Sequence, residues 1–77
     1  MNKLELKELT QKYVVYFYRP EDRGTHGEIS MKFSDEKASI VLRAGENSHW
    51  HDRHALTAVE KCVKEQDFPL KFTQAWY

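Results

Sequence analysis

The sequence predicts an α+β fold with two layers, in which one long helix packs on one face of an antiparallel sheet. Residues 13–43 contain three strand-like runs separated by polar turns, and residues 70–77 alternate in the same way. Between them, residues 49–66 change to a helical period. We therefore predict the order (α)-β-β-β-α-β, a three-stranded meander plus a C-terminal strand. The length of 77 residues fits a single domain, 1–77.

The first segment, "KLELKELTQK" at residues 3–12, is ambiguous between helix and strand. Most of its residues are strong helix formers, and Leu6, Leu9 and Tyr13 fall on one side of a helix. Leu4 and Leu6 also alternate with charged residues, as they would in a strand. We predict a short helix here, with a strand as the alternative.

The run "YVVYFY" at residues 13–18 predicts a strand, because β-branched and aromatic residues suit a pleated surface. Both of its faces are apolar, so we expect a strand that is central or covered on both sides. Pro20 is expected to end it, since proline has no N–H to donate to a ladder. We expect Val15 and Phe17 to point at the helix, so that Val14, Tyr16 and Tyr18 face the other way.

Two further strands complete the predicted meander. The run "GEISMKF" at residues 27–33 alternates cleanly, as a half-buried strand does, and "ASIVLR" at 38–43 follows the same pattern. The sequence "SDEK" between them has the composition of a turn. The residues expected on the inner face are Ile29, Met31 and Phe33 in the first run and Ala38, Ile40 and Leu42 in the second.

Residues 49–66 predict a helix long enough to cross the sheet. Ser48 has the side chain of an N-cap. Pro69 disfavours helical geometry at Phe68, so the helix is expected to stop before that residue. The residues that form its apolar stripe are Ala55, Leu56, Val59, Cys62 and Val63.

The candidate metal ligands are three histidines in "HWHDRH", residues 49–54: His49, His51 and His54. The segment resembles the H-x-H-x-D-H motif of the metallo-β-lactamase superfamily, but Arg53 stands where that family has its aspartate. Successive helical residues are rotated by about 100°, so His49 and His51 point in nearly opposite directions on a helix. We therefore predict no metal site. The alternative is one ion shared by His51 and His54, with a third ligand from His26 or from His49.

No residue set in the sequence has the pattern of a catalytic site. Cys62 lies on the apolar stripe of the predicted helix, where a small buried residue is expected rather than a nucleophile. We therefore expect no enzyme activity and no cofactor. A single cysteine excludes an internal disulfide, and no apolar run is long enough to cross a bilayer or to act as a signal peptide. These features predict a cytoplasmic protein without a membrane partner.

The candidate partner-binding residues are Tyr16, Tyr18 and Tyr77, which would form an exposed aromatic face of the sheet. Basic residues beside such a face are one means of binding single-stranded nucleic acid. The order of elements also resembles that of double-stranded-RNA-binding domains. However, the chain has 12 basic and 12 acidic residues, so its net charge argues against nucleic acid. The alternatives are that the N-terminal segment covers the tyrosines or that two copies pair. The basic residues considered are Lys32, Arg43 and Lys71.

Four short segments, "YRP", "RHAL", "FP" and a final "AWY", carry a weak resemblance to small uncharacterised proteins of bacteria and their phages. The resemblance implies a stand-alone cytoplasmic domain. We expect a non-enzymatic protein-interaction or regulatory domain that binds an unknown protein or itself. The alternatives are a nucleic-acid-binding accessory protein and a small histidine-based metal-binding protein.

Overall fold

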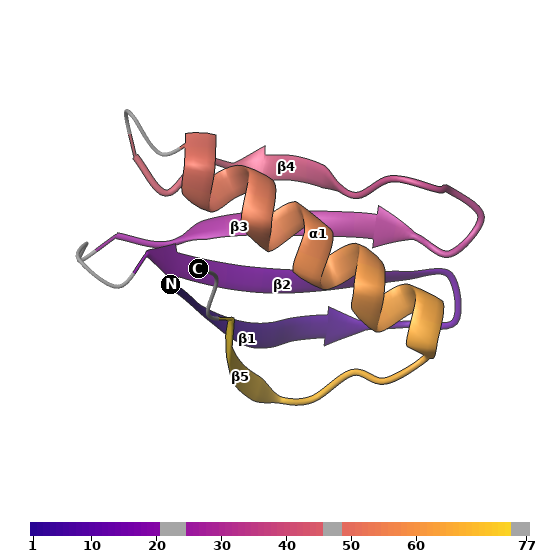
Figure 1. Cartoon of the computed structure of the whole chain (residues 1–77). Helices are drawn as coiled ribbons and strands as arrows, with labels where there is room; N and C mark the ends of the chain where they lie inside the picture. The colour runs from indigo at the N-terminus through magenta and orange to yellow at the C-terminus, as the bar shows by residue number, and fades with distance from the viewer. Residues whose placement is uncertain (21–24, 46–48, 75–77) are drawn as a thin grey trace.

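The structure, a computed structural model, describes residues 1–20, 25–45 and 49–74. In these ranges it has five strands and one helix, and the sheet order is β4-β3-β2-β1-β5 with every neighbouring pair antiparallel (Figure 1). The elements are β1 (Asn2–Leu9), β2 (Tyr13–Pro20), β3 (Gly27–Lys32), β4 (Ser39–Leu42), α1 (His49–Glu65) and β5 (Lys71–Gln74).

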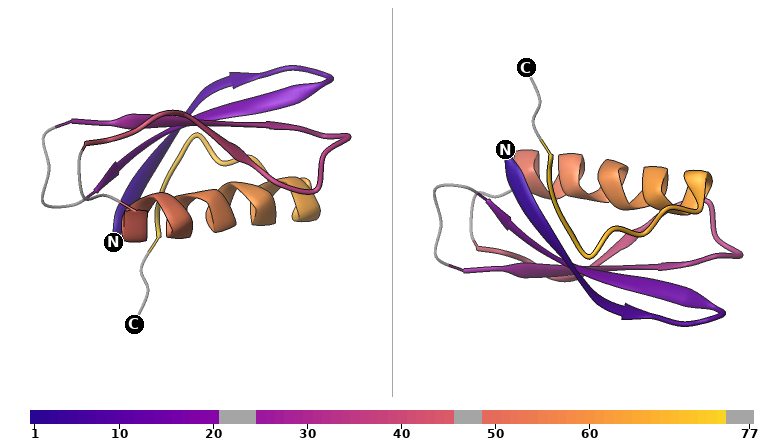
Figure 2. Two further views of the ribbon diagram at one scale, coloured as in Figure 1. Left: turned by 90° about the horizontal axis from the view of Figure 1, so that it is seen from above. Right: turned by 90° about the horizontal axis from the view of Figure 1, so that it is seen from below.

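Helix α1 runs obliquely across one face of the sheet and contacts all five strands (Figure 2). No described element covers the opposite face, which we call the open face. The predicted α+β layout is therefore confirmed. Helix α1, the one helix among the described residues, is not long and apolar enough to cross a membrane.

The predicted helix at residues 3–12 is wrong, because β1 occupies most of this segment. Strand β1 pairs with β2 on one side and with β5 on the other, so Leu4 lies opposite both Tyr18 and Phe72. The hydrogen bonds of these two ladders and the burial of Leu4 outweigh the helical preference of the local sequence. The alternation of Leu4 and Leu6 was the correct signal.

The predicted facing of β2 is also wrong. Val14, Tyr16 and Tyr18 are completely buried on the side that α1 covers, and Val15 and Phe17 lie on the open face. The reversal has a physical reason, because the covered side provides acceptors for both phenol groups. Tyr16 donates to the carbonyl oxygen of Pro69 at 2.8 Å, and Tyr18 donates to a carboxylate on α1.

The other strand predictions hold in their main features. Ile29 and Met31 are buried, whereas Leu42 is 48% exposed and not on the inner face as expected. Strand β4 is a short edge strand, and a register shift between Glu28 and Ile29 changes how it meets β3. Pro20 is the last residue of β2, as expected, and it pairs with Asn2.

The helix buries the predicted stripe, including Ala55, Val59 and Cys62. It ends in a Schellman motif: Gln66 has a positive φ of 53°, and Asp67 N–H donates to the carbonyl oxygen of Cys62 at 3.0 Å. The left-handed residue therefore terminates the helix before Pro69 is reached. Ser48, the predicted N-cap, lies outside the described residues.

Candidate binding site on the open face of the sheet

The open face is polar because each strand alternates between buried and exposed side chains. Strand β1 is the clearest case, with Leu4 buried and Lys3 and Glu5 exposed. The face is formed by Lys3, Glu5 and Lys7 from β1, Val15, Phe17 and Arg19 from β2, Glu28 and Ser30 from β3, and Lys71 and Thr73 from β5.

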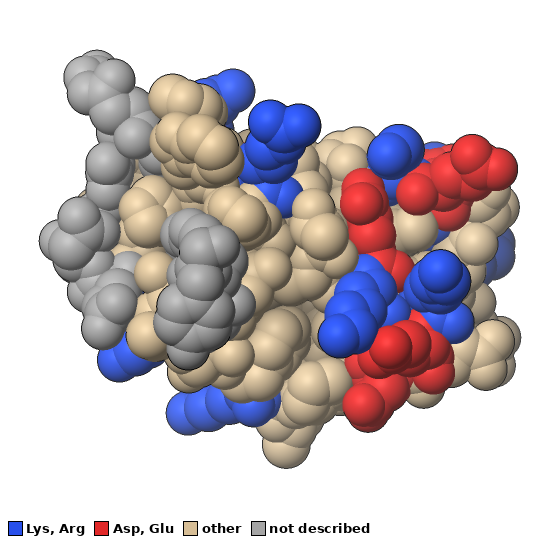
Figure 3. Space-filling view, viewed as in Figure 1, with Lys and Arg blue, Asp and Glu red and all other residues tan. Residues whose placement is uncertain are grey.

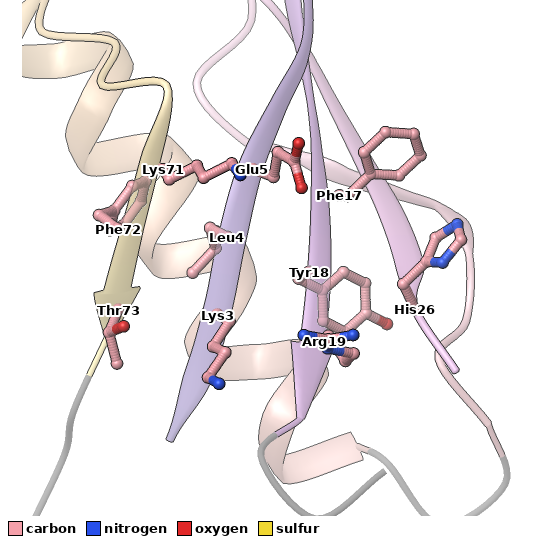
Figure 4. Close-up of a pocket in the computed structure, with 10 residues that line it drawn as sticks. All are labelled: Lys3, Leu4, Glu5, Phe17, Tyr18, Arg19, His26, Lys71, Phe72 and Thr73. Carbon is pink, nitrogen blue, oxygen red and sulfur yellow. The ribbon is translucent and has the colours of Figure 1, made fainter. Parts of the chain in front are cut away.

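One end of the open face contains a hollow of about 440 Å³ that is broadly open to solvent. Strands β1, β2 and β5 supply most of its lining, and His26, which precedes β3, lies at its border (Figure 4). The residues that line it are Lys3, Leu4, Glu5, Phe17, Tyr18, Arg19, His26, Lys71, Phe72 and Thr73.

Strand register places two of the three cations of this hollow opposite each other. Lys3 lies directly opposite Arg19 across the β1–β2 ladder, and Lys71 lies opposite Glu5 across the β1–β5 ladder. In the described parts of the chain, none of the three cations makes a salt bridge. Like charges directly opposite each other destabilise a sheet, so this arrangement favours an anion at the hollow.

Beside the hollow, the open face contains a cation that does have a partner. Lys7 Nζ lies 2.6 Å from Glu28 Oε1 and 5.3 Å from the centre of the Phe17 ring. His26 meets the same ring edge-to-face, with 4.8 Å between ring centroids. Phe17 is therefore held between two side chains, and the charge of Lys7 is compensated.

A buried polar network lies behind the hollow and joins β2 to the first turns of α1. The Tyr18 hydroxyl donates to Asp52 Oδ1 and accepts from the Ala44 N–H at 3.2 Å. Arg43 Nη1 lies 3.5 Å from Asp52 Oδ2. Burial raises the pKa of the Tyr18 phenol far above its usual range, so this group stays protonated and remains a donor.

Two amide side chains attach the same end of α1 to the sheet. Asn2 Nδ2 donates to the carbonyl oxygen of His51 at 2.9 Å, and Gln74 Nε2 donates to that of His54 at 2.6 Å. Asn2 is completely buried. These contacts fix the strands β1 and β5, which carry Lys3 and Lys71, relative to the helix.

The three candidate histidines lie along the first two turns of α1. His49 is exposed, and the exposed Trp50 ring stacks on His54 with 5.9 Å between centroids. His51 is partly buried at the edge of the covered face. Within the described ranges, no three His, Cys, Asp or Glu side chains are placed to hold a metal ion.

Cys62 is a buried free thiol on the covered face. Burial raises its pKa, which disfavours the reactive thiolate. The residue therefore has the environment of a packing residue rather than that of a nucleophile.

Two of the three partner-binding residues predicted from the sequence are not on an exposed face. Tyr16 and Tyr18 are 0% exposed and belong to the core, and Tyr77 lies outside the described residues. Of the basic residues considered with them, Lys71 does line the hollow, whereas Arg43 contacts Asp52.

The sequence reading missed Lys3, Phe17 and Arg19 as site residues, and it considered His26 only as a candidate third metal ligand. The polar alternation of Lys3, Glu5 and Lys7 would have indicated an exposed strand face if this segment had been read as a strand. Compared with protein-family models, curated proteins and solved structures, the chain matches none of them. The resemblance to small bacterial and phage proteins stays a prediction.

Proposed function

We propose that the chain is a non-enzymatic, cytoplasmic protein-interaction domain that binds an acidic segment of a partner protein on its open face. The observation that carries the proposal is the group of cations at the hollow, Lys3, Arg19 and Lys71, which make no salt bridge to another described residue. A cation without a partner in the folded chain is available to a charge on another molecule. The single free cysteine, Cys62, supports a reducing compartment.

The helix side provides a useful contrast. Around the C-terminal end of α1, acidic and basic side chains are intermixed (Figure 3). A shallow depression there is lined by Lys61 and Lys64 together with several carboxylates. Cations that are surrounded by acids attract a partner's acids weakly. The hollow on the open face is therefore the better candidate for an acidic partner.

A partner protein also fits the charge of the chain better than a nucleic acid does. Basic and acidic residues are equal in number, so no long-range attraction draws a polyanion to the molecule. Local complementarity at one hollow is enough to orient a short acidic segment.

The test is an NMR titration of the chain with a short peptide of Asp and Glu residues at low salt. We expect amide shifts at Lys3, Phe17, Arg19 and Lys71, and none along the exposed side of α1. The double variant Lys3→Glu/Arg19→Glu is expected to lose about tenfold or more in affinity, because it replaces attraction by repulsion.

The matched control is Lys12→Glu/Lys37→Glu, which changes the net charge equally at two exposed positions outside the hollow. It is expected to keep wild-type affinity apart from a small long-range effect. An equal loss in both variants, or shifts confined to α1, would contradict the proposal.

A further inference from the structure

The positive charge of the hollow is of the size that a dianion would balance, and a single carboxylate would balance only part of it. Among the described residues, its lining contains the cations of Lys3, Arg19 and Lys71 and one carboxylate, that of Glu5. The formal charges of these four side chains leave two positive charges. A carboxylate of Asp or Glu would compensate one of them, whereas a phosphate monoester carries about −1.5 to −2 at pH 7.

The donors of the hollow also fit a tetrahedral oxyanion. Arg19 presents a planar guanidinium that can donate to two oxygens at once, and Lys3, directly opposite it, presents an ammonium. Lys71, on the other neighbouring strand, lies opposite Glu5, and its side chain extends towards that residue (Figure 4). Donors from two strands, those of Lys3 and Arg19, therefore lie side by side, and together they can serve the three oxygens of a phosphate.

The surroundings of the hollow favour one phosphate over a chain of phosphates. Along the same face, Glu28 already compensates Lys7, and Glu8 follows near the end of β1. A nucleic-acid backbone that continued along the strands would place further phosphates beside these carboxylates. An isolated phosphate on a protein side chain would contact the residues of the hollow and would not extend to these carboxylates.

We infer that the hollow binds a phosphate group carried by a side chain of the partner protein. This inference rests on the proposed function, and it specifies the acidic group that the open face recognises. Phosphorylation of the partner would then increase its affinity for the chain.

The test uses a library of short peptides with a central serine and randomised neighbours, prepared with phosphoserine, serine or glutamate at the centre. We expect phosphoserine peptides to bind about tenfold more tightly than glutamate peptides, because the dianion makes more charge-assisted hydrogen bonds. Arg19→Gln should remove this preference, whereas Lys12→Gln, outside the hollow, should leave it unchanged. Arg19→Lys is expected to recover part of it.

The outcomes separate this inference from the function on which it rests. If the acidic peptide binds the open face but phosphoserine gives no gain over glutamate, the inference is wrong and the proposed function stands. If a single-stranded oligonucleotide binds at Arg19 more tightly than any phosphopeptide, the ligand is a nucleic acid and both are wrong. If nothing binds at low salt, both also fail.

Discussion

On the face that α1 covers, Tyr16 is completely buried and its hydroxyl donates to a backbone carbonyl oxygen. On the open face, the next residue, Phe17, lies half-buried between a lysine and a histidine. The two rings are neighbours in sequence and have similar size. Their difference shows that the position of a residue relative to α1, rather than its hydrophobicity, decides whether it belongs to the core or to the surface.

The comparison also separates stability from recognition. The covered face is filled by apolar side chains and by polar groups that satisfy one another, as Tyr18 and Asp52 do. The open face contributes cations, such as Lys3 and Arg19, that lie opposite each other and make no salt bridge to another described residue, so they do not stabilise the isolated chain. Substitutions on the two faces should therefore have different effects on stability.

The largest effect is expected for Val59→Asp on α1. Val59 is 0% exposed, and an unpaired carboxylate in its place would cost several kcal/mol, comparable to the roughly 5 kcal/mol stability of a small domain. Circular dichroism should show an unfolded chain. The control Val41→Asp, at a position 62% exposed on β4, should stay folded. A folded Val59→Asp chain would mean that α1 does not pack as described.

The next largest effect is expected at Tyr16, and the same substitution at Phe17 serves as its comparison. Tyr16→Ala should lower the free energy of unfolding by about 3–5 kcal/mol, because it leaves a cavity under α1. Phe17→Ala should cost about 1 kcal/mol, since its ring is only half-buried. Urea denaturation monitored by circular dichroism measures both values. Equal losses would show that the open face contributes to the core as much as the covered one.

A smaller effect is expected at Gly27, where the ring of Tyr18 lies against the backbone of β3. A Cβ at Gly27 would overlap the Tyr18 ring and lie 2.5 Å from the carbonyl oxygen of Leu42. Gly27→Ala should therefore cost about 2–3 kcal/mol in thermal or urea unfolding. Ser30→Ala, on the open side of the same strand, should change stability by less than about 0.5 kcal/mol. A neutral Gly27→Ala would show that Tyr18 can move aside.

The smallest effect should be a gain at a position that belongs to neither face. Gln66 has a left-handed conformation, which glycine adopts without a steric penalty. Gln66→Gly should raise the free energy of unfolding by about 0.5–1 kcal/mol. Lys64→Gly, within the last helical turn, should lower it by about 1 kcal/mol. A loss at Gln66 would contradict the assigned helix end.

Much of the fold could be predicted from periodicity, but the faces of the sheet could not. The alternation in β3 and the stripe through Val59 identified their elements, because each has one polar and one apolar side. In β2 both sides are apolar, so only the packed structure distinguishes Tyr16 from Phe17. For residues 3–12, local helix propensity competed with pairing to strands distant in sequence, and pairing prevailed.

The candidate site was harder to predict than the fold for the same reason. Lys3, Arg19 and Lys71 are far apart in the sequence. They line the same hollow only because of the register of three strands. Assigning the first segment to a helix removed Lys3 from the sheet. Arg19 was treated as the end of a strand and not as part of a face. The sequence could therefore indicate the hollow only if β1 had been paired correctly with its neighbours.

Strand β1 lies between β2 and β5, and its residue Asn2 pairs with Gln74 near the other end of the described chain (Figure 1). During synthesis, the ribosome releases β1 long before β5. Until Gln74 emerges, one edge of β1 lacks its final neighbour, and Lys71 has not yet joined the hollow. The proposed binding should therefore appear only after β5 has been synthesised and a long loop has closed.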